Sequence, residues 1–287
     1  MKHHKIVFIG SGNITSAIVS GIVEKGYPSQ KITVCAPSEC HRGVLSKKWG
    51  VISSSDNAAA IRQGDVIIFS VKPQKIRELC QDLCNTNIDF SNKLILSVVT
   101  GISISRFCEL LNAKLNLIRM MPNTPVRVHE GMTALFAKEE VNEADRHFTT
   151  ELMCSVGKVC WLKNEADMNK VIAVSASAPA YFFLFMEAIE REAVFLGFSQ
   201  EMARLLVQQT ARGVCALVEK SSALSLSELR QQVSSKGGTT EAAIEFFNKK
   251  QLFTIVSSAM KAAIAQAEFL EKKLFKKVET CTISKID

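Results

Sequence analysis

The first half of the chain alternates short apolar runs with stretches in which apolar residues recur at helical spacing. Short apolar runs between turn residues are typical of buried strands, and the amphipathic stretches predict helices. We predict strands at residues 5–9, 32–35, 65–71, 94–99 and 115–120, with later strands at 133–136 and 156–162. Predicted helices lie at residues 40–48, 76–84, 103–111 and 142–153. Repeated strand–helix units of this kind predict a mostly parallel sheet with right-handed crossovers.

The pattern changes after about residue 163, because the strands stop and every later segment has helical spacing. We predict helices at residues 167–195, 200–220, 225–233, 240–248 and 251–277. Several of them are apolar over more than one face, which indicates that a second subunit covers part of them. The sequence therefore predicts an α/β domain at residues 1–163 and an all-α domain at residues 164–287.

The most apolar stretch, residues 171–186, contains Pro179 and is shorter than the ~20 residues that a membrane span needs. We interpret it as a buried helix and expect no membrane partner. The chain starts Met1-Lys2-His3-His4-Lys5 and continues as a predicted strand, so we expect no signal peptide.

Composition adds few further constraints. The 287 residues carry a net charge of +7, and glutamates interleave with the lysines near the C-terminus (Lys272, Lys273, Lys276 and Lys277), so we expect a solvated helix face and no nucleic-acid partner. The nine cysteines are scattered without a C-x-x-C pair, and the five histidines are dispersed. This spacing predicts neither a metal site nor a disulfide framework, and it favours reduced thiols in a cytoplasmic protein.

A glycine-rich turn follows the first predicted strand. The sequence Gly10-Ser11-Gly12-Asn13-Ile14-Thr15 comes directly before a segment with helical spacing. Strand, glycine turn and helix in this order are the context of a dinucleotide fingerprint, in which the second glycine lets a pyrophosphate approach the backbone. Thr15 replaces the usual third glycine, and we expect this change to loosen the packing of helix against strand.

The end of the second strand bears on the choice of nucleotide. No acid stands at Ala36 or Pro37 to select a free ribose hydroxyl, whereas Ser38 and Arg42 suit a 2′-phosphate. We therefore predict NADP(H) as the preferred cofactor, with NAD(H) as the alternative. Because strand ends line the ligand crevice of such sheets, Lys72 and Asn123 are candidates for the nicotinamide side, and a plain surface lysine and a rigid turn are the alternatives.

A second glycine loop precedes the helix predicted at residues 240–248. It reads Ser234-Ser235-Lys236-Gly237-Gly238-Thr239-Thr240-Glu241. Backbone N–H groups at the start of a helix suit a small carboxylate, and the threonine hydroxyls lie beside them.

Five motifs occur in one order along the chain: Gly10-Ser11-Gly12-Asn13-Ile14, Val71-Lys72-Pro73-Gln74, Met121-Pro122-Asn123-Thr124-Pro125, Pro179-Ala180-Tyr181 and Ser235-Lys236-Gly237-Gly238-Thr239-Thr240. In this order they resemble the pyrroline-5-carboxylate reductases, over nearly the whole chain. The resemblance implies a Rossmann-like NAD(P)-binding domain followed by a helical dimerisation domain. It also implies the reduction of 1-pyrroline-5-carboxylate to L-proline, the last step of proline biosynthesis, by homodimers that commonly assemble into decamers.

The resemblance also implies roles for individual residues. The cofactor pyrophosphate would be held by Gly10, Ser11, Gly12, Asn13, Ile14 and Thr15, and the adenosine end by Ser38 and Asn57. The nicotinamide half would be flanked by Val71, Lys72, Pro73, Val99 and Thr100. The substrate carboxylate would be gripped by Ser235, Gly238, Thr239 and Thr240, with Glu165 close to the substrate and Thr240 beside the ring nitrogen as the catalytic residue.

Three departures from the family pattern leave other functions open. Ala176 and Ala178 replace glycines and add methyl groups, and Lys236 replaces a proline. One alternative is a related imine reductase or β-hydroxyacid reductase, for which Lys170 is the nearby candidate lysine. The other is a non-catalytic NADP-binding paralogue.

Overall fold

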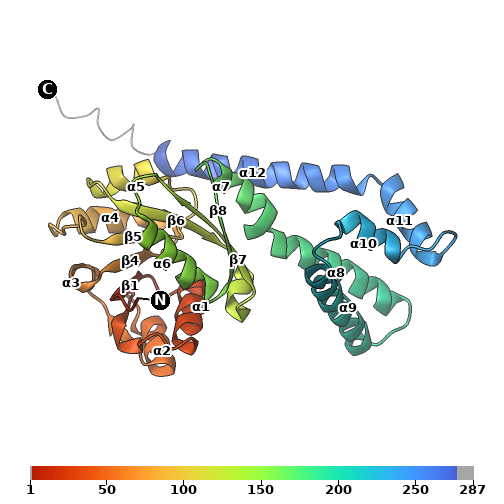
Figure 1. Ribbon diagram of the computed structural model, residues 1–287, viewed down its shortest axis with the longest axis horizontal. Helices are drawn as coiled ribbons and strands as arrows, with labels where there is room; N and C mark the ends of the chain where they lie inside the picture. Colours follow the sequence, from red (N-terminus) through yellow and green to blue (C-terminus); the bar gives the residue numbers. More distant parts are fainter. Residues whose placement is uncertain (1, 277–287) are drawn as a thin grey trace. The chain divides into compact units, whose positions relative to one another are not determined.

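The computed structural model describes residues 2–276, which divide into two compact units (Figure 1). The first unit comprises residues up to 177 together with residues 263–276, and the second comprises residues 178–262. Lys277, Glu279 and Cys281 lie outside the described residues. The units separate after residue 177, whereas the sequence predicts a domain division at residue 163, which stays a prediction.

The first unit is built on an eight-stranded sheet with the order β3-β2-β1-β4-β5-β6-β7-β8. Neighbouring strands are parallel except for β6 and β7, which confirms the predicted, mostly parallel sheet. The strands are β1 (Ile6–Ile9), β2 (Ile32–Cys35), β3 (Ile52–Ser54), β4 (Val66–Phe69), β5 (Leu94–Ser97), β6 (Asn116–Pro122), β7 (Gly131–Ala137) and β8 (Gly157–Trp161).

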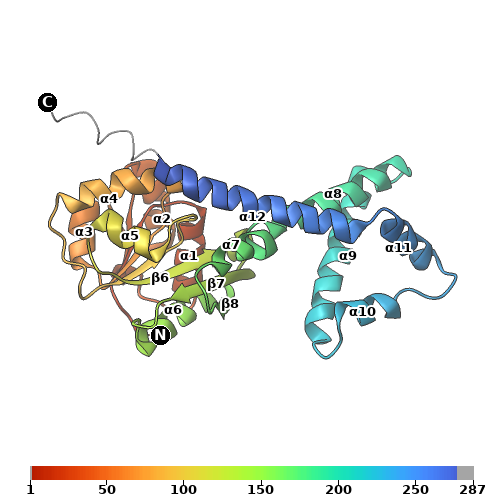
Figure 2. The same cartoon turned by 90° about the horizontal axis from the view of Figure 1, so that it is seen from above.

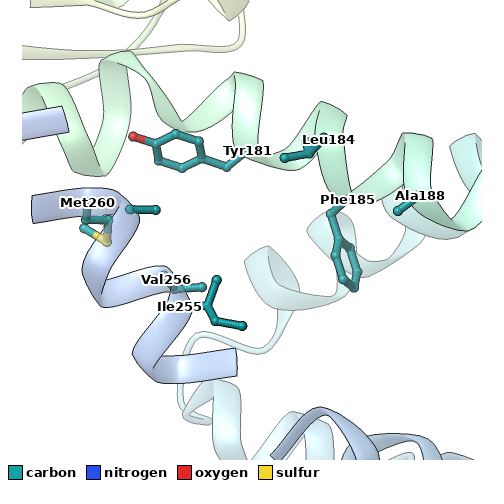
Figure 3. Close-up of a pocket in the computed structure, with 8 residues that line it drawn as sticks. Tyr181, Leu184, Phe185, Ala188, Ile255, Val256 and Met260 are labelled. Atoms are coloured by element: carbon teal, nitrogen blue, oxygen red, sulfur yellow. The ribbon is translucent and has the colours of Figure 1, made fainter. Parts of the chain in front are cut away.

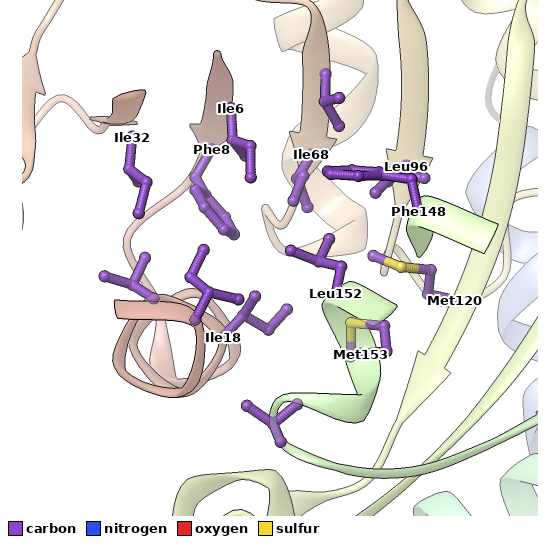
Figure 4. Packing of buried hydrophobic residues seen from close by; sticks show 14 of the residues in the cluster. Ile6, Phe8, Ile18, Ile32, Ile68, Leu96, Met120, Phe148, Leu152 and Met153 are labelled. Carbon is purple, nitrogen blue, oxygen red and sulfur yellow. The ribbon is translucent and has the colours of Figure 1, made fainter. Parts of the chain in front are cut away.

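Helices cover both faces of this sheet. Alternate residues of β1 point to opposite faces, because strand side chains alternate. Ile6 and Phe8 pack with one group of helices, as Figure 4 shows, and Val7 and Ile9 with the other. The first group is α1 (Asn13–Glu24), α2 (Glu39–Trp49) and α6 (Glu143–Cys154), and the second is α3 (Asn57–Gln63), α4 (Ile76–Cys84) and α5 (Ile104–Leu111). This is the Rossmann-like arrangement that the sequence predicts.

The second unit is all-helical, which confirms the other half of the predicted fold. It contains α8 (Ala178–Phe195), α9 (Gln200–Lys220), α10 (Leu226–Gln232), α11 (Thr239–Lys249) and the beginning of α12 (Leu252–Lys276). Figure 2 shows α12 as one unbroken helix, whose last residues, from 263 on, belong to the first unit.

The single helix predicted at residues 167–195 is instead three segments. It consists of α7 (Asp167–Val171), a π-helical turn at Ile172–Ala176, and α8. The wider turn forms because the Ser177 N–H donates to the carbonyl of Ile172, five residues back. Pro179, which has no N–H, follows as the second residue of α8, a place in the first turn where no donor is needed.

The interpretation of residues 171–186 as a buried helix is wrong for the single chain. Phe182 and Phe183 are 68% and 65% exposed, and most of the α8 surface is accessible. Within the described part of the chain, the stretch Asp167–Phe195 has the length and apolar composition of a membrane span. Length and composition alone are weak evidence, because an apolar helix that lacks its protein partner has the same properties.

Candidate functional site

The turn between β1 and α1 is shaped for a phosphate group. Gly10 has a φ of 116°, and a Cβ there would lie 2.6 Å from the backbone oxygen of Ser70, so only glycine fits. Gly12 caps α1 without a side-chain hydrogen bond, and the space beside its Cα is open. Because the first N–H groups of a helix have no intrahelical partners, this open turn can receive a pyrophosphate.

Thr15 packs inside this turn, and the expectation that it loosens the packing of helix against strand stays a prediction. The side chain is fully buried, and its Oγ1 donates to the Gly10 carbonyl at 2.9 Å. The same oxygen lies 2.5 Å from the Oγ of Ser70, which follows β4. Thr15 therefore shapes the loop from inside. Sequence reasoning missed Ser70, whose only signal is its position directly after a buried strand.

The end of β2 carries a positive charge. Arg42 Nη1 donates to the carbonyl groups of Ala36 and Pro37, at 2.9 Å each, which holds the guanidinium at the strand end. Ser38 is exposed there and caps α2 without a side-chain hydrogen bond. Asn57, half-buried, is the first residue of α3, at the end of β3. The arrangement fits a 2′-phosphate, because neither Ala36 nor Pro37, the two residues that follow β2, is an acid.

The residues predicted to flank the nicotinamide follow β4 and β5. Lys72 is exposed and precedes a short 3₁₀ turn at Pro73–Lys75, and Val71 is half-buried against the core. Val99 is buried, and its N–H donates to Ser97 Oγ at 3.2 Å, so its side chain and its N–H are both engaged within the protein. Thr100 is exposed. Because neighbouring parallel strands end on the same edge, these groups share one side of the sheet.

Asn123 is engaged within the protein. Its Oδ1 accepts the Met132 N–H at 2.9 Å, and its Nδ2 lies 3.4 Å from both the carbonyl oxygen and the Oγ of Ser175. These contacts tie the end of β6 to β7 and to the π-helical turn, which favours the rigid-turn interpretation of the Met121–Pro125 motif.

Glu165, predicted to lie close to the substrate, also has partners in the first unit. Its Oε1 accepts the Ile104 N–H at 2.7 Å and Arg119 Nη1 at 2.8 Å. Arg119 is buried, with 8% of its side chain exposed.

The glycine loop predicted to bind the substrate lies in the second unit, at the start of α11. Gly237 has a φ of 72°, and the Gly238 N–H donates to the Ser235 carbonyl at 2.9 Å. A Cβ on Gly238 would lie 2.8 Å from that carbonyl oxygen. The Gly237 N–H donates to Glu241 Oε2 at 2.6 Å, which braces the turn. Thr239 and Thr240 form the exposed first turn of the helix, where N–H groups are free to bind an anion.

The methyl groups of Ala176 and Ala178 are accommodated. Ala176 packs against the small cluster of Met121, Ala134 and Met168, and Ala178 is only 9% exposed. Among the described residues, no three His, Cys, Asp or Glu side chains are grouped as metal ligands.

A separate apolar pocket of 280 Å³ lies between α8 and the first part of α12 (Figure 3). Its lining includes Tyr181, Phe185, Val256 and Met260. The Tyr181 hydroxyl is buried and, within the described part of the chain, has no hydrogen-bond partner. None of the predicted site residues lines this pocket, and its apolar walls suit packing against another helix rather than chemistry.

Two family models match the chain. Residues 165–270 match "Pyrroline-5-carboxylate reductase dimerisation", and residues 5–101 match "NADP oxidoreductase coenzyme F420-dependent". The first of these supports oligomerisation.

Similar proteins extend the match to nearly the full length. The pyrroline-5-carboxylate reductase of Vibrio alginolyticus is 52% identical over 95% of this chain and 99% of its own, and that of Pasteurella multocida is 41% identical over the same shares. The solved reductase of Coxiella burnetii is 34% identical, with a TM-score of 0.86 over 95% of this chain and 99% of its own. A Plasmodium falciparum pyrroline carboxylate reductase with NADP bound is 27% identical, with a TM-score of 0.83 over 94% and 99%. The fold, the two glycine turns and these matches together show that the chain belongs to the pyrroline-5-carboxylate reductase family.

Proposed function

We propose that this protein reduces 1-pyrroline-5-carboxylate to L-proline, with NADPH as the preferred reductant and NADH as the alternative. The observation that carries the proposal is the 52% identity to a pyrroline-5-carboxylate reductase over nearly the whole of both chains. The open phosphate turn at Gly12 and the positive charge at the end of β2 support NADPH. When bound, this cofactor supplies the hydride.

The chain's own residues bind and orient the cofactor. The turn from Gly10 to Thr15 presents backbone N–H groups to the pyrophosphate, with the Thr15 side chain holding the turn from behind. Ser38 and Arg42 hold the 2′-phosphate, and Asn57 approaches the adenosine. The nicotinamide half lies along the residues that follow β4 and β5, namely Val71, Lys72, Pro73, Val99 and Thr100.

The loop before α11 orients the substrate. The backbone N–H groups of Thr239 and Thr240, with the Ser235 hydroxyl, hold the carboxylate at the Gly238 turn. The Thr240 hydroxyl oxygen accepts a hydrogen bond from the N–H of the protonated ring nitrogen. A protonated cyclic imine is already electrophilic, so the protein mainly needs to fix the imine carbon for hydride transfer. Orientation of this kind supplies about 7–11 kcal/mol of barrier reduction.

The assembly follows the same proposal. The exposed apolar helices pair two copies into a homodimer, with a decamer as the larger assembly, in the cytoplasm. Residues 1–163 act as the cofactor domain and residues 164–287 as the domain for substrate and dimerisation. The matched dimerisation model over residues 165–270 supports this division.

The test is a pair of substitutions in the α11 loop. We expect Thr240→Ala combined with Gly238→Val to abolish NADPH oxidation by 1-pyrroline-5-carboxylate while the affinity for NADPH is kept. Thr254→Ala, at an exposed threonine near the start of α12, serves as the control and should retain turnover. Turnover that survives the double substitution would contradict the assignment of this loop.

The structure weakens the β-hydroxyacid alternative. Lys170, its candidate catalytic lysine, is 70% exposed and pairs with Asp167 Oδ1 at 2.7 Å, one turn away on the same helix. A lysine that lies on the surface and pairs with a neighbouring carboxylate does not provide a catalytic group inside a binding site for a hydroxyacid. A screen of ketoacids and hydroxyacids separates the two activities.

A further inference from the structure

The ion pair between a buried arginine, Arg119, and the half-buried Glu165 has no part in the mechanism given above. Arg119 of β6 is 6% exposed, and its Nη1 donates to Glu165 Oε1 at 2.8 Å. The same carboxylate oxygen accepts the backbone N–H of Ile104 at 2.7 Å. Glu165 thus joins three segments of the first unit: β6, the start of α5, and the loop that precedes α7.

The pair lies at the strand ends where the nicotinamide is proposed to bind. Arg119 is the register partner of Ser97, the last residue of β5. The segment after Ser97 is fixed near its start, because the Val98 N–H donates to the Phe69 carbonyl at 3.0 Å and the Val99 N–H to Ser97 Oγ. It is fixed at its end by the bond from Ile104 to Glu165. Between these anchors lies Thr100, which, together with Val99, is among the residues proposed to flank the nicotinamide.

The contact to Ile104 also caps a helix. Ile104 is the first residue of α5, and first-turn N–H groups have no partner within the helix. Ser103 accepts the Arg106 N–H, and Glu165 supplies a second cap from 61 residues away. The negative charge of Glu165 suits the positive end of the helix and the buried guanidinium together.

We propose that Glu165, paired with Arg119, is a positioning residue for the nicotinamide side of the site, and that it acts by fixing the loop at residues 98–103. This proposal rests on the proposed function for the identity of the cofactor. This role differs from the one that the sequence resemblance implies. The resemblance places the Glu165 carboxylate near the substrate, whereas in the structure its Oε1 binds Arg119 and the first residue of α5.

Glu165→Gln separates the two roles, because it keeps an acceptor for Ile104 and removes the charge that pairs with Arg119. We expect the NADPH dissociation constant, measured by fluorescence titration, to rise about tenfold, with the KM for 1-pyrroline-5-carboxylate within about twofold of wild type at saturating NADPH. Glu78→Gln is the matched control, since it removes one charge from the exposed pair Lys75–Glu78 on the neighbouring α4. A raised KM with unchanged NADPH affinity would show a substrate contact, and no change in either constant would show a structural role only; both overturn the proposal.

A second comparison holds even where Glu165→Gln folds poorly. Arg119→Met leaves the Glu165 carboxylate unpaired, whereas Arg119→Met combined with Glu165→Gln removes both charges and keeps the acceptor for Ile104. We expect the double variant to bind NADPH more tightly than Arg119→Met alone, and equal or weaker binding overturns the proposal. These titrations need no turnover, so a failure of the proposed reaction in wild type remains distinguishable from a failure of this inference.

Discussion

At the scale of single residues, the cofactor turn depends on a contact that links two distant parts of the chain. Thr15 and Ser70 are 55 positions apart, yet their hydroxyl groups meet behind Gly10. A glycine at position 15 would let helix and strand approach, whereas the threonine fills that space and satisfies the Gly10 carbonyl. The local motif predicts the turn correctly, but only the folded sheet brings Ser70 to it.

We expect Thr15→Val to cost about 1–3 kcal/mol of unfolding free energy, because it keeps the shape but removes the hydroxyl that donates to the Gly10 carbonyl and meets Ser70 Oγ. Combining it with Ser70→Ala should cost less than the sum of the single changes, since the two hydroxyls are partners. Urea unfolding of the four proteins measures this coupling. Additive costs would contradict the contact.

A second prediction at this scale concerns acid stability. Burial lowers the pKa of His4 below its usual 6.5, the Lys2 charge adds to this, Asp65 and Asp145 oppose it, and Lys31 contributes a small further lowering. As the pH falls, the His4 ring therefore takes up its proton in the unfolded chain before it does so in the folded protein. The contribution of His4 to stability is fully present above pH 6.5 and is lost as the pH falls through that value toward the lower folded pKa.

When the pH is lowered from neutral to below the folded pKa of His4, we expect the unfolding free energy to fall more for wild type than for His4→Gln. His147→Gln, at an exposed histidine of α6, is the control for the same chemical change. An identical decline in wild type and His4→Gln would show that burial of His4 does not contribute to acid sensitivity.

At the scale of elements, the sequence predicts regular segments well and irregular ones poorly. Strand β2 and helices α4 and α9 occupy the predicted residues, because their apolar spacing matches one period throughout. Strand β3 was missed, since its three residues are mostly polar and exposed and only the pairing with β2 makes them a strand. The π-helical turn was also missed, because the bond from Ser177 to Ile172 that widens it leaves no signal in the apolar spacing of residues 167–195.

The loop before α11 was recognised from its glycines, and its geometry gives a prediction for that element. We expect Gly238→Ala to raise the KM for 1-pyrroline-5-carboxylate about tenfold, because the added Cβ would push the Ser235 carbonyl and shift the first turn of α11. The NADPH dissociation constant should stay as in wild type. Gly43→Ala, where nothing lies near the added Cβ, is the control for the same chemical change. An unchanged KM would remove Gly238 from the substrate site.

At the scale of the whole molecule, the helical unit exposes more apolar surface than a free monomer normally does. The exposed aromatic side chains include Phe182, Phe183, Phe246 and Phe253. The sequence predicts that a second subunit covers such faces. It does not predict the number of copies, because that number depends on how whole chains fit together and not on any local pattern of residues.

We expect wild type to elute as an oligomer in size-exclusion chromatography with light scattering, and Phe183→Glu to shift it toward monomer, because a charge in an apolar interface stays without a partner. Val44→Glu places the same charge on α2, where the valine is 58% exposed, and should leave the mass unchanged. An unaltered mass for Phe183→Glu would exclude this face from the interface.

The reaction itself is measured by following NADPH absorbance after the purified protein is mixed with 1-pyrroline-5-carboxylate, with L-proline quantified at the end. We expect rapid oxidation of NADPH, one proline formed for each NADPH consumed, and a slower or weaker response with NADH. NADPH that binds but is not oxidised in the presence of this imine would overturn the proposed reaction.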